Sequence, residues 1–124
     1  MIPLRVLVVE DDALIAMLLE ELLVGMGHEV CATAATEADA VRAATRYAPD
    51  LMIVDARLGR GSGIAAVEQI LLAGPLAHVF VSGDADQVRA RRPGAVVVRK
   101  PFRKAELVTA IDTALDASPA TLRG

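Results

Sequence analysis

Short apolar segments of strand length alternate with stretches of helical periodicity along the whole chain, and this alternation most limits how the chain can fold. The segments at residues 6–9 and 51–54 read Val-Leu-Val-Val and Leu-Met-Ile-Val, without a polar side chain. Strands that are apolar on both sides are typical of a parallel sheet covered by helices on both faces. Five such rounds in 124 residues predict one α/β domain, a doubly wound sandwich around a five-stranded parallel sheet.

The expected strands and helices follow from the apolar runs and from the residues that start or stop a helix. We expect strands at residues 4–9, 28–33, 51–54, 77–81 and 95–98. We expect a first helix that ends near residue 26 and further helices at 36–47, 64–73, 86–91 and 105–115. Asp11 or Asp12 caps the first helix and Gly27 ends it. Thr36 caps the second helix, with Asp39 reaching back to it.

Polar residues follow the apolar runs at the points where the predicted strands end. Glu10 and Asp11 follow the first strand, Asp55 the third, Ser82 the fourth and Lys100 the fifth. The carboxyl ends of parallel strands meet at one rim, where open α/β sheets bind ligands, so we expect these side chains to lie together. Carboxylates suit Mg2+, and an aspartate beside a cation can accept a phosphoryl group. Asp55 is the expected acceptor, with Lys100 and Ser82 contacting the phosphoryl oxygens.

Each of these residues also has a purely structural interpretation. Acids between a strand and a helix commonly cap the helix, so the run Glu10-Asp11-Asp12 could serve only that purpose. Asp55 and Ser82 could be turn residues, and Lys100 could be a solvated charge. The conjunction favours a functional site, because four separate strand ends would otherwise carry compatible groups on one rim by accident.

Four short motifs make the sequence similar to a known family. They are Val8-Val9-Glu10-Asp11-Asp12, Ile53-Val54-Asp55, Val81-Ser82-Gly83 and Lys100-Pro101-Phe102. The chain resembles the receiver domain of bacterial two-component response regulators over residues 4 to about 117. The resemblance implies a flavodoxin-like sheet with strand order 2-1-3-4-5, in a domain at residues 1–117 followed by a polar tail at 118–124. It also implies a lysine-proline step that is often a cis peptide.

The resemblance also implies site residues and partners. A sensor histidine kinase or a phosphotransfer protein would phosphorylate Asp55, with Ser82 as the hydroxyl switch and Lys100 as the phosphoryl contact. The implied ligands of Mg2+, or of Mn2+ in its place, are Glu10, Asp11, Asp55 and the main-chain carbonyl of Arg57. Such a protein is a cytoplasmic signalling domain and not an enzyme that turns over an external substrate. Its downstream partner stays open, as does dimerisation on phosphorylation.

The sequence departs from the family pattern at three points. Val97 stands where the family usually has an aromatic residue that moves with the hydroxyl, so the switch is expected to differ or to be weak. The segment between Ser82 and Lys100 is shorter than is typical, and its helix has few apolar anchors apart from Val88, which predicts a loosely held helix. The glycines at 59–63 predict a mobile loop.

Basic residues near the rim add two hypotheses. Arg57 lies two residues beyond Asp55, and its guanidinium is expected to pair with Glu10 at rest or to shield the phosphoryl group. The alternative is a solvated loop arginine. Further basic residues gather between Arg89 and Lys104, either as a solvated face or as a docking surface for an acidic or helical partner.

Composition disfavours several other classes of protein. A net charge of −3 and 2% aromatic residues disfavour direct binding of nucleic acid. The single cysteine, Cys31, excludes an internal disulfide and fits a reducing cytosol. Neither a signal peptide nor an apolar segment of membrane-spanning length is visible. His28 and His78 fall at strand starts away from the acidic rim, where surface or edge positions are expected.

Two other functions stay open at this point. A small phosphatase that uses Asp55 on an external substrate would need a second acid, for which Asp12 and Asp84 are the spare candidates. A receiver-like interaction module without phosphorylation is the other, supported by Val97 and by the short helix expected at 86–91. The chain is either a free-standing receiver or part of a longer protein, and Met1 close to the first strand favours an authentic amino terminus.

Overall fold

A five-stranded parallel sheet forms the centre of the molecule. The computed structural model describes residues 2–117 of the 124-residue chain, so the predicted tail at 118–124 lies outside the described residues. The strands are β1 (Arg5–Val9), β2 (Glu29–Ala34), β3 (Leu51–Asp55), β6 (Ala77–Ser82) and β7 (Val97–Arg99). Their order, β2-β1-β3-β6-β7, confirms the predicted 2-1-3-4-5 arrangement of a flavodoxin-like domain.

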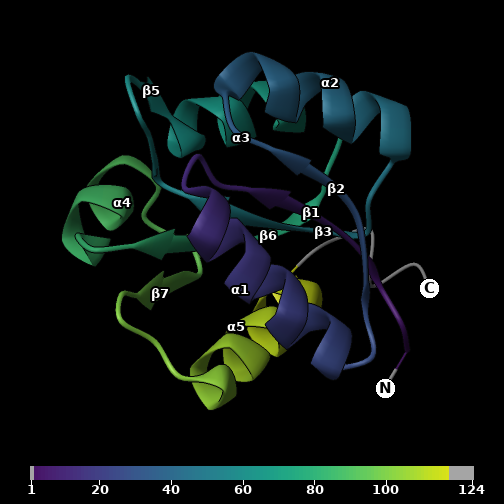
Figure 1. Ribbon diagram of the computed structural model, residues 1–124. Helices are drawn as coiled ribbons and strands as arrows, with labels where there is room; N and C mark the ends of the chain where they lie inside the picture. Colours follow the sequence, from purple (N-terminus) through teal and green to yellow (C-terminus); the bar gives the residue numbers. More distant parts are fainter. Residues whose placement is uncertain (1, 118–124) are drawn as a thin grey trace.

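Helices cover both faces of this sheet (Figure 1). They are α1 (Ala13–Gly25), α2 (Glu37–Tyr47), α3 (Gly63–Leu71), α4 (Ala85–Arg91) and α5 (Lys104–Ala117). Successive strand residues point to opposite faces, so Val8 and Ile53 pack with α1 and α5, whereas Leu7 and Met52 pack with α2, α3 and α4. All four side chains are fully buried, which explains the continuous apolar runs in the sequence. No helix in the described part of the chain is both long and apolar enough to cross a membrane.

Side-chain caps start the helices that follow the strands. The Asp12 carboxylate accepts hydrogen bonds from the backbone N–H groups of Leu14 and Ile15, so Asp12 is the cap of α1. The Thr36 hydroxyl accepts from the backbone N–H of Asp39, as expected for a cap of α2. The Asp39 side chain does not reach back to this cap, because it forms an ion pair with Arg42 on the same helix.

The glycine-rich segment at residues 59–63, predicted to be a mobile loop, takes part in a short hairpin. Two short antiparallel strands, β4 (Arg57–Leu58) and β5 (Gly61–Ser62), pair with each other directly after β3. Gly59 makes the turn with a positive φ of 55°, which an L side chain rarely adopts. The Glu37 carboxylate accepts a hydrogen bond from the backbone N–H of Ser62 at 2.5 Å and ties the hairpin to α2. The glycines therefore provide a tight turn and close packing.

The two histidines differ in their surroundings. His28 is 5% exposed, so the expectation of a surface or edge position was wrong for this residue. The turn at Gly27 folds the chain back, and the His28 backbone N–H donates to the Leu23 carbonyl at 3.0 Å. The His28 ring accepts the backbone N–H of Leu4 on Nδ1 at 3.1 Å, while Nε2 is buried without a partner among the described residues. His78 is half-buried, with Nδ1 2.8 Å from the Leu76 carbonyl oxygen.

Candidate functional site

Three carboxylates meet where the central strands β1 and β3 end. Glu10 and Asp11 directly follow β1, and Asp55 is the last residue of β3. One carboxylate oxygen from each of the three lies within 4.8 Å of the others. Glu10 and Asp55 are buried, at 4% and 8% exposure, whereas Asp11 is exposed. The strands thus bring together the three acids that the sequence predicts for the rim.

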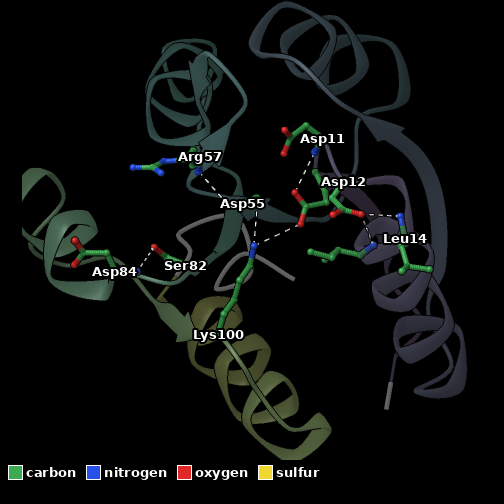
Figure 2. A network of polar contacts seen from close by, with 10 residues as sticks. Asp11, Asp12, Leu14, Asp55, Arg57, Ser82, Asp84 and Lys100 are labelled. Carbon is green, nitrogen blue, oxygen red and sulfur yellow. Dashed lines mark hydrogen bonds and ion pairs between the residues drawn. The ribbon is translucent and has the colours of Figure 1, made fainter.

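Lys100 directly follows the edge strand β7, and its side chain points into the same cluster (Figure 2). Its Nζ donates to Asp55 Oδ2 at 3.1 Å and lies 3.6 Å from Glu10 Oε1. Burial disfavours the charged ammonium, but the hydrogen bond and the charge of Asp55, together with Glu10, outweigh it and raise the pKa of Lys100. The Lys100–Pro101 peptide bond is cis. Lys100 is therefore held as a cation against the predicted acceptor.

Glu10 is the carboxylate of the cluster whose hydrogen bonding is least complete. Its Oε2 accepts the backbone N–H of Asp11 at 3.0 Å, but its Oε1 is buried without a hydrogen-bond partner among the described residues. Burial, reinforced by the neighbouring Asp55 carboxylate, raises the pKa of Glu10 to about 8. A buried, unpartnered oxygen beside two further carboxylates is a suitable site for a hard cation. The donor set fits Mg2+ because all the side-chain ligands are oxygens.

Ser82 connects the site to α4. It is buried at the end of β6, and its hydroxyl accepts the backbone N–H of Asp84 at 2.9 Å. The Asp84 carboxylate in turn accepts the backbone N–H of Gln87 and caps α4. The Ser82 carbonyl also accepts the backbone N–H of Lys100 at 2.8 Å. The hydroxyl therefore lies at the rim but is engaged with the start of α4.

Arg57 contributes its backbone and not its side chain to the cluster. Its backbone N–H donates to Asp55 Oδ1 at 3.0 Å. The guanidinium points away from Asp55 (Figure 2) and forms no ion pair with any residue in the described range. The expected resting pair between Arg57 and Glu10 is not formed, because Lys100 lies next to Glu10 instead.

Gly63 packs against the backbone of Asp55, and the sequence analysis missed it as a site residue. It is the first residue of α3, and a Cβ atom there would overlap the Asp55 carbonyl oxygen and lie 2.7 Å from Val54 Cγ1. Its backbone N–H donates to the Ala56 carbonyl at 3.0 Å. A glycine directly before the apolar start of a helix can indicate close packing of the backbone. The sequence analysis interpreted this glycine only as a source of flexibility.

The predicted residues line one open cavity of about 960 Å³. Glu10, Asp11, Asp55, Ser82, Lys100 and Arg57 all border it. Its walls come from the ends of β1, β3 and β6, from the hairpin and from α4. The Lys100 ammonium thus contacts both the Asp55 and the Glu10 carboxylates, and all three side chains border a cavity that opens to solvent.

The fold and this rim define a class, the flavodoxin-like α/β proteins whose acidic cluster surrounds a strand-end aspartate. The family model of the response regulator receiver domain matches residues 6–112. The chain therefore belongs to the response regulator receiver domain family, as a signalling domain of two-component systems.

Relatives of known name support this membership. The chain is 37% identical to the transcriptional regulatory protein PdtaR of Mycobacterium tuberculosis, in an alignment that covers 98% of the chain and 65% of the relative. It is 35% identical to the phyllosphere-induced regulator PhyR of Methylorubrum extorquens, over 90% of the chain and 43% of the relative. The chain thus spans less than two thirds of the length of these two proteins.

A solved structure shows the same fold. The solution structure of the receiver domain of Erythrobacter litoralis PhyR superposes with a TM-score of 0.85 at 32% identity. The superposition covers 94% of this chain and 93% of that domain. The likeness therefore extends over nearly the whole of both molecules.

Proposed function

We propose that this domain acts in the cytoplasm as a phosphoacceptor that receives a phosphoryl group on Asp55 from a sensor histidine kinase or a phosphotransfer protein. The observation that carries the proposal is the contact of Lys100 Nζ with Asp55 Oδ2 at 3.1 Å, beside Glu10 and in the lining of the cavity. The Asp55 carboxylate would attack phosphorus while the bond from phosphorus to the donor imidazole nitrogen breaks. The imidazole leaves with that electron pair.

The neighbouring side chains have separate roles in this step. Glu10, Asp11, Asp55 and the main-chain carbonyl of Arg57 would hold Mg2+, with Mn2+ as a substitute. Bound Mg2+ supplies positive charge that neutralises the phosphoryl oxygens. Lys100 moves from the carboxylate to a phosphoryl oxygen, and its raised pKa keeps it charged for this purpose. The acceptor geometry is kept by the Arg57 backbone N–H on the other Asp55 oxygen.

Ser82 is the proposed element that transmits the phosphorylated state. If the Ser82 side chain rotates so that its hydroxyl donates to a phosphoryl oxygen, the backbone N–H of Asp84 loses its acceptor at the start of α4. Val97 is half-buried on β7 and carries no ring, so this contact with α4 takes the place of an aromatic relay. The surface of α4, β7 and α5 would report the change to a downstream protein.

The rival functions have less support in the structure. The phosphatase reading needs a spare acid, but the Asp12 and Asp84 carboxylates both accept backbone N–H groups as helix caps. The interaction module without phosphorylation is favoured by Val97 and by the short helix α4, and the similarity to PhyR is compatible with it. The intact set of three acids, a hydroxyl and a lysine in one cavity favours phosphorylation.

Phosphoryl transfer to Asp55 can be tested with a small donor. Incubation with radiolabelled acetyl phosphate and Mg2+ is expected to give an acid-stable, base-labile label on the protein. The label should be absent from Asp55→Asn and absent when a chelator replaces Mg2+, because the acceptor or the charge on the phosphoryl oxygens is then missing. Turnover of a generic phosphate ester would instead favour the phosphatase.

The matched control for this experiment is Asp12→Asn. Asp12 caps α1 next to the cluster, so this variant removes a neighbouring carboxylate without removing a proposed ligand, and its label should persist. Millimolar Mg2+ should also raise the melting temperature of the wild type and leave that of Asp11→Asn nearly unchanged. Absence of label in the wild type, together with a melting temperature indifferent to Mg2+, would support the interaction module.

A further inference from the structure

The hairpin between β3 and α3 adjoins the proposed phosphoacceptor directly. Arg57 of β4 pairs with Ser62 of β5. The backbone N–H of Arg57 donates to Asp55 Oδ1 at 3.0 Å. At the other end of the hairpin, the Ser62 hydroxyl accepts the backbone N–H of Ala65 and caps α3. Whatever holds the hairpin in place therefore also holds the backbone beside the acceptor.

The paired residues Arg57 and Ser62 direct their backbone groups away from each other. Hydrogen-bonded and non-hydrogen-bonded pairs alternate along an antiparallel ladder. The N–H groups of Arg57 and Ser62 both donate to side chains outside the hairpin, to Asp55 and to Glu37, as expected for a non-hydrogen-bonded pair. In such a pair the carbonyl groups also point away from the partner strand. The Arg57 carbonyl, a proposed ligand of Mg2+, is therefore not used within the hairpin.

The Glu37 carboxylate is the contact that ties this hairpin to α2. Glu37 is the first residue of α2, which lies in the same layer as α3 (Figure 1), and its Oε1 accepts the backbone N–H of Ser62 at 2.5 Å. Hydrogen bonds to a charged acceptor are stronger than those between neutral groups. A Cβ atom at Gly61 would lie 3.0 Å from the same Oε1. The carboxylate thus packs directly against the hairpin.

Helix stability does not account for where this carboxylate points. An acid in the first turn stabilises a helix through the helix dipole without needing a contact elsewhere. Asp39 lies in the same turn of α2, and its carboxylate pairs with Arg42 on the helix itself. Glu37 forms no ion pair within residues 2–117 and contacts a residue 25 positions further along the chain. The two acids of one turn therefore differ in their partners, which makes Asp39 a matched control.

We infer that Glu37 is a positioning residue for the phosphoacceptor site and acts on it through the hairpin. Glu37 holds Ser62, and the ladder connects Ser62 to Arg57. Arg57 in turn contacts Asp55 through its N–H and would offer its carbonyl to Mg2+. The inference rests on the proposed function, which it deepens, because the carbonyl is a ligand only if Mg2+ binds there. Outer-shell partners of this kind typically change metal affinity about tenfold or more.

The first test measures exchange of backbone amides with water by NMR in the Mg2+-free protein. Glu37→Ala should speed exchange at Ser62 by about tenfold, because a hydrogen bond to a charged acceptor is lost, and should speed it at Arg57 as well. Glu37→Gln should restore most of the protection, since its amide oxygen can accept the same N–H. Asp39→Ala should leave both amides unchanged. A change confined to Ser62 would overturn the inference, because the disturbance would not reach the site.

The second test measures the affinity for Mg2+ by isothermal titration calorimetry. Glu37→Ala should bind Mg2+ about tenfold more weakly than the wild type. Asp39→Ala loses one negative charge from the same turn of α2, so the change in long-range attraction for the cation is matched. Asp39→Ala and Glu37→Gln should both bind close to the wild-type affinity. Equal affinities of the two alanine variants would refute a positioning role.

A further variant displaces the Glu37 carboxylate without removing it. Gly61→Ala places a Cβ atom 3.0 Å from Glu37 Oε1, so the carboxylate must move away. This change should weaken Mg2+ binding in the wild type and have little effect in the Glu37→Ala background, where the space is free. The same loss of affinity in both backgrounds would contradict the inference, because Gly61 would then act without Glu37.

Failure of the proposed function would give a different pattern of results. The wild type would then take no label from acetyl phosphate, while the exchange differences at Ser62 and Arg57 in the Glu37 variants would persist. Normal labelling of the wild type, together with unchanged Arg57 exchange and Mg2+ affinity in Glu37→Ala, would instead refute only the role inferred for Glu37.

Discussion

The two halves of the site are attached to parts of the molecule that differ in how firmly they are held. The acidic half follows β1 and β3, the central strands, in which every residue except Arg5 is buried. The other half consists of Ser82 and Lys100, which adjoin α4 and β7. α4 has only seven residues, and of the three residues of β7 only Val98 is buried.

This difference fits the different tasks proposed for the two halves. Ligands of a cation need a fixed separation, and central strands packed on both faces provide it. Elements that change on switching come from the less stable parts of a protein, since little packing is lost when they move. The hydroxyl of Ser82 is linked to such a part through its hydrogen bond with the backbone of Asp84.

The largest expected effect comes from a matched pair of glycines, one in each half. Gly63→Ala would force a Cβ atom into the backbone of Asp55 and should cost about 3 kcal/mol or more of unfolding free energy, with loss of labelling. A Cβ atom at Gly83, which directly follows Ser82, would meet nothing within 4 Å. Gly83→Ala should therefore change stability by less than about 0.5 kcal/mol. Urea denaturation of both variants measures the difference.

Equal costs at the two glycines would contradict the contrast between a tightly packed acidic half and an open second half. A Gly63→Ala protein too unstable for urea titration would still be informative. Its amide exchange near Asp55, compared with that of Gly83→Ala, would then report whether the disturbance is centred on β3.

A smaller effect is expected from two valines that belong to the same apolar cluster. Val54 on β3 and Val88 on α4 are 0% and 1% exposed, so each Val→Ala change deletes the same buried atoms. Val54→Ala should cost about 2–3 kcal/mol, because the central strand cannot close the cavity. Val88→Ala should cost about 1 kcal/mol, since the short helix can relax. A cost at Val88 equal to that at Val54, in urea denaturation, would show that α4 is as firmly held as β3.

The firmly held half was also the part that the sequence predicted well. The apolar runs alone predicted the positions of β1 and β3, because such continuous runs are typical of parallel strands buried on both faces. These runs end directly at Glu10 and Asp55. Prediction was less complete where the backbone and not the side chain carries the information. The hairpin after β3 and the close approach of Gly63 to Asp55 depend on tertiary contacts that periodicity does not encode.

Side-chain partners were predictable in type but not in detail. Lys100 was expected to contact the phosphoryl oxygens, and in this structure it forms ion pairs with Asp55 and Glu10. Glu10 was expected to pair with Arg57, whose guanidinium points away (Figure 2). Arg57 and Lys100 both lie shortly after strands that end at the rim. Which of the two side chains enters the acidic cluster depends on the path of the backbone after β7, and the sequence does not show this path. The burial of His28 likewise depends on how the turn at Gly27 folds back.

The smallest expected effect concerns pH and compares the histidines at the starts of two strands. His28 immediately precedes β2, which pairs with β1, and His78 lies on β6, which carries Ser82; both histidines lie at the strand ends away from the acidic rim. Burial lowers the pKa of both rings from the ordinary value of 6.5. In each case the unfolded chain binds a proton that the folded chain does not, so stability is complete above pH 6.5 and falls as the pH drops through the folded-state pKa.

The two rings should not contribute equally to this loss. Protonation of His28 places a proton on Nδ1, which accepts the backbone N–H of Leu4, so the hydrogen bond is lost. His78 faces the Leu76 carbonyl with Nδ1, which donates there in both the neutral and the charged ring. His28→Gln should therefore flatten the decline of melting temperature between about pH 6.5 and 5 more than His78→Gln does. Should His28→Gln fail to fold, an NMR titration of the wild-type ring protons gives the answer directly, and a His28 midpoint at or above the ordinary value would refute the prediction.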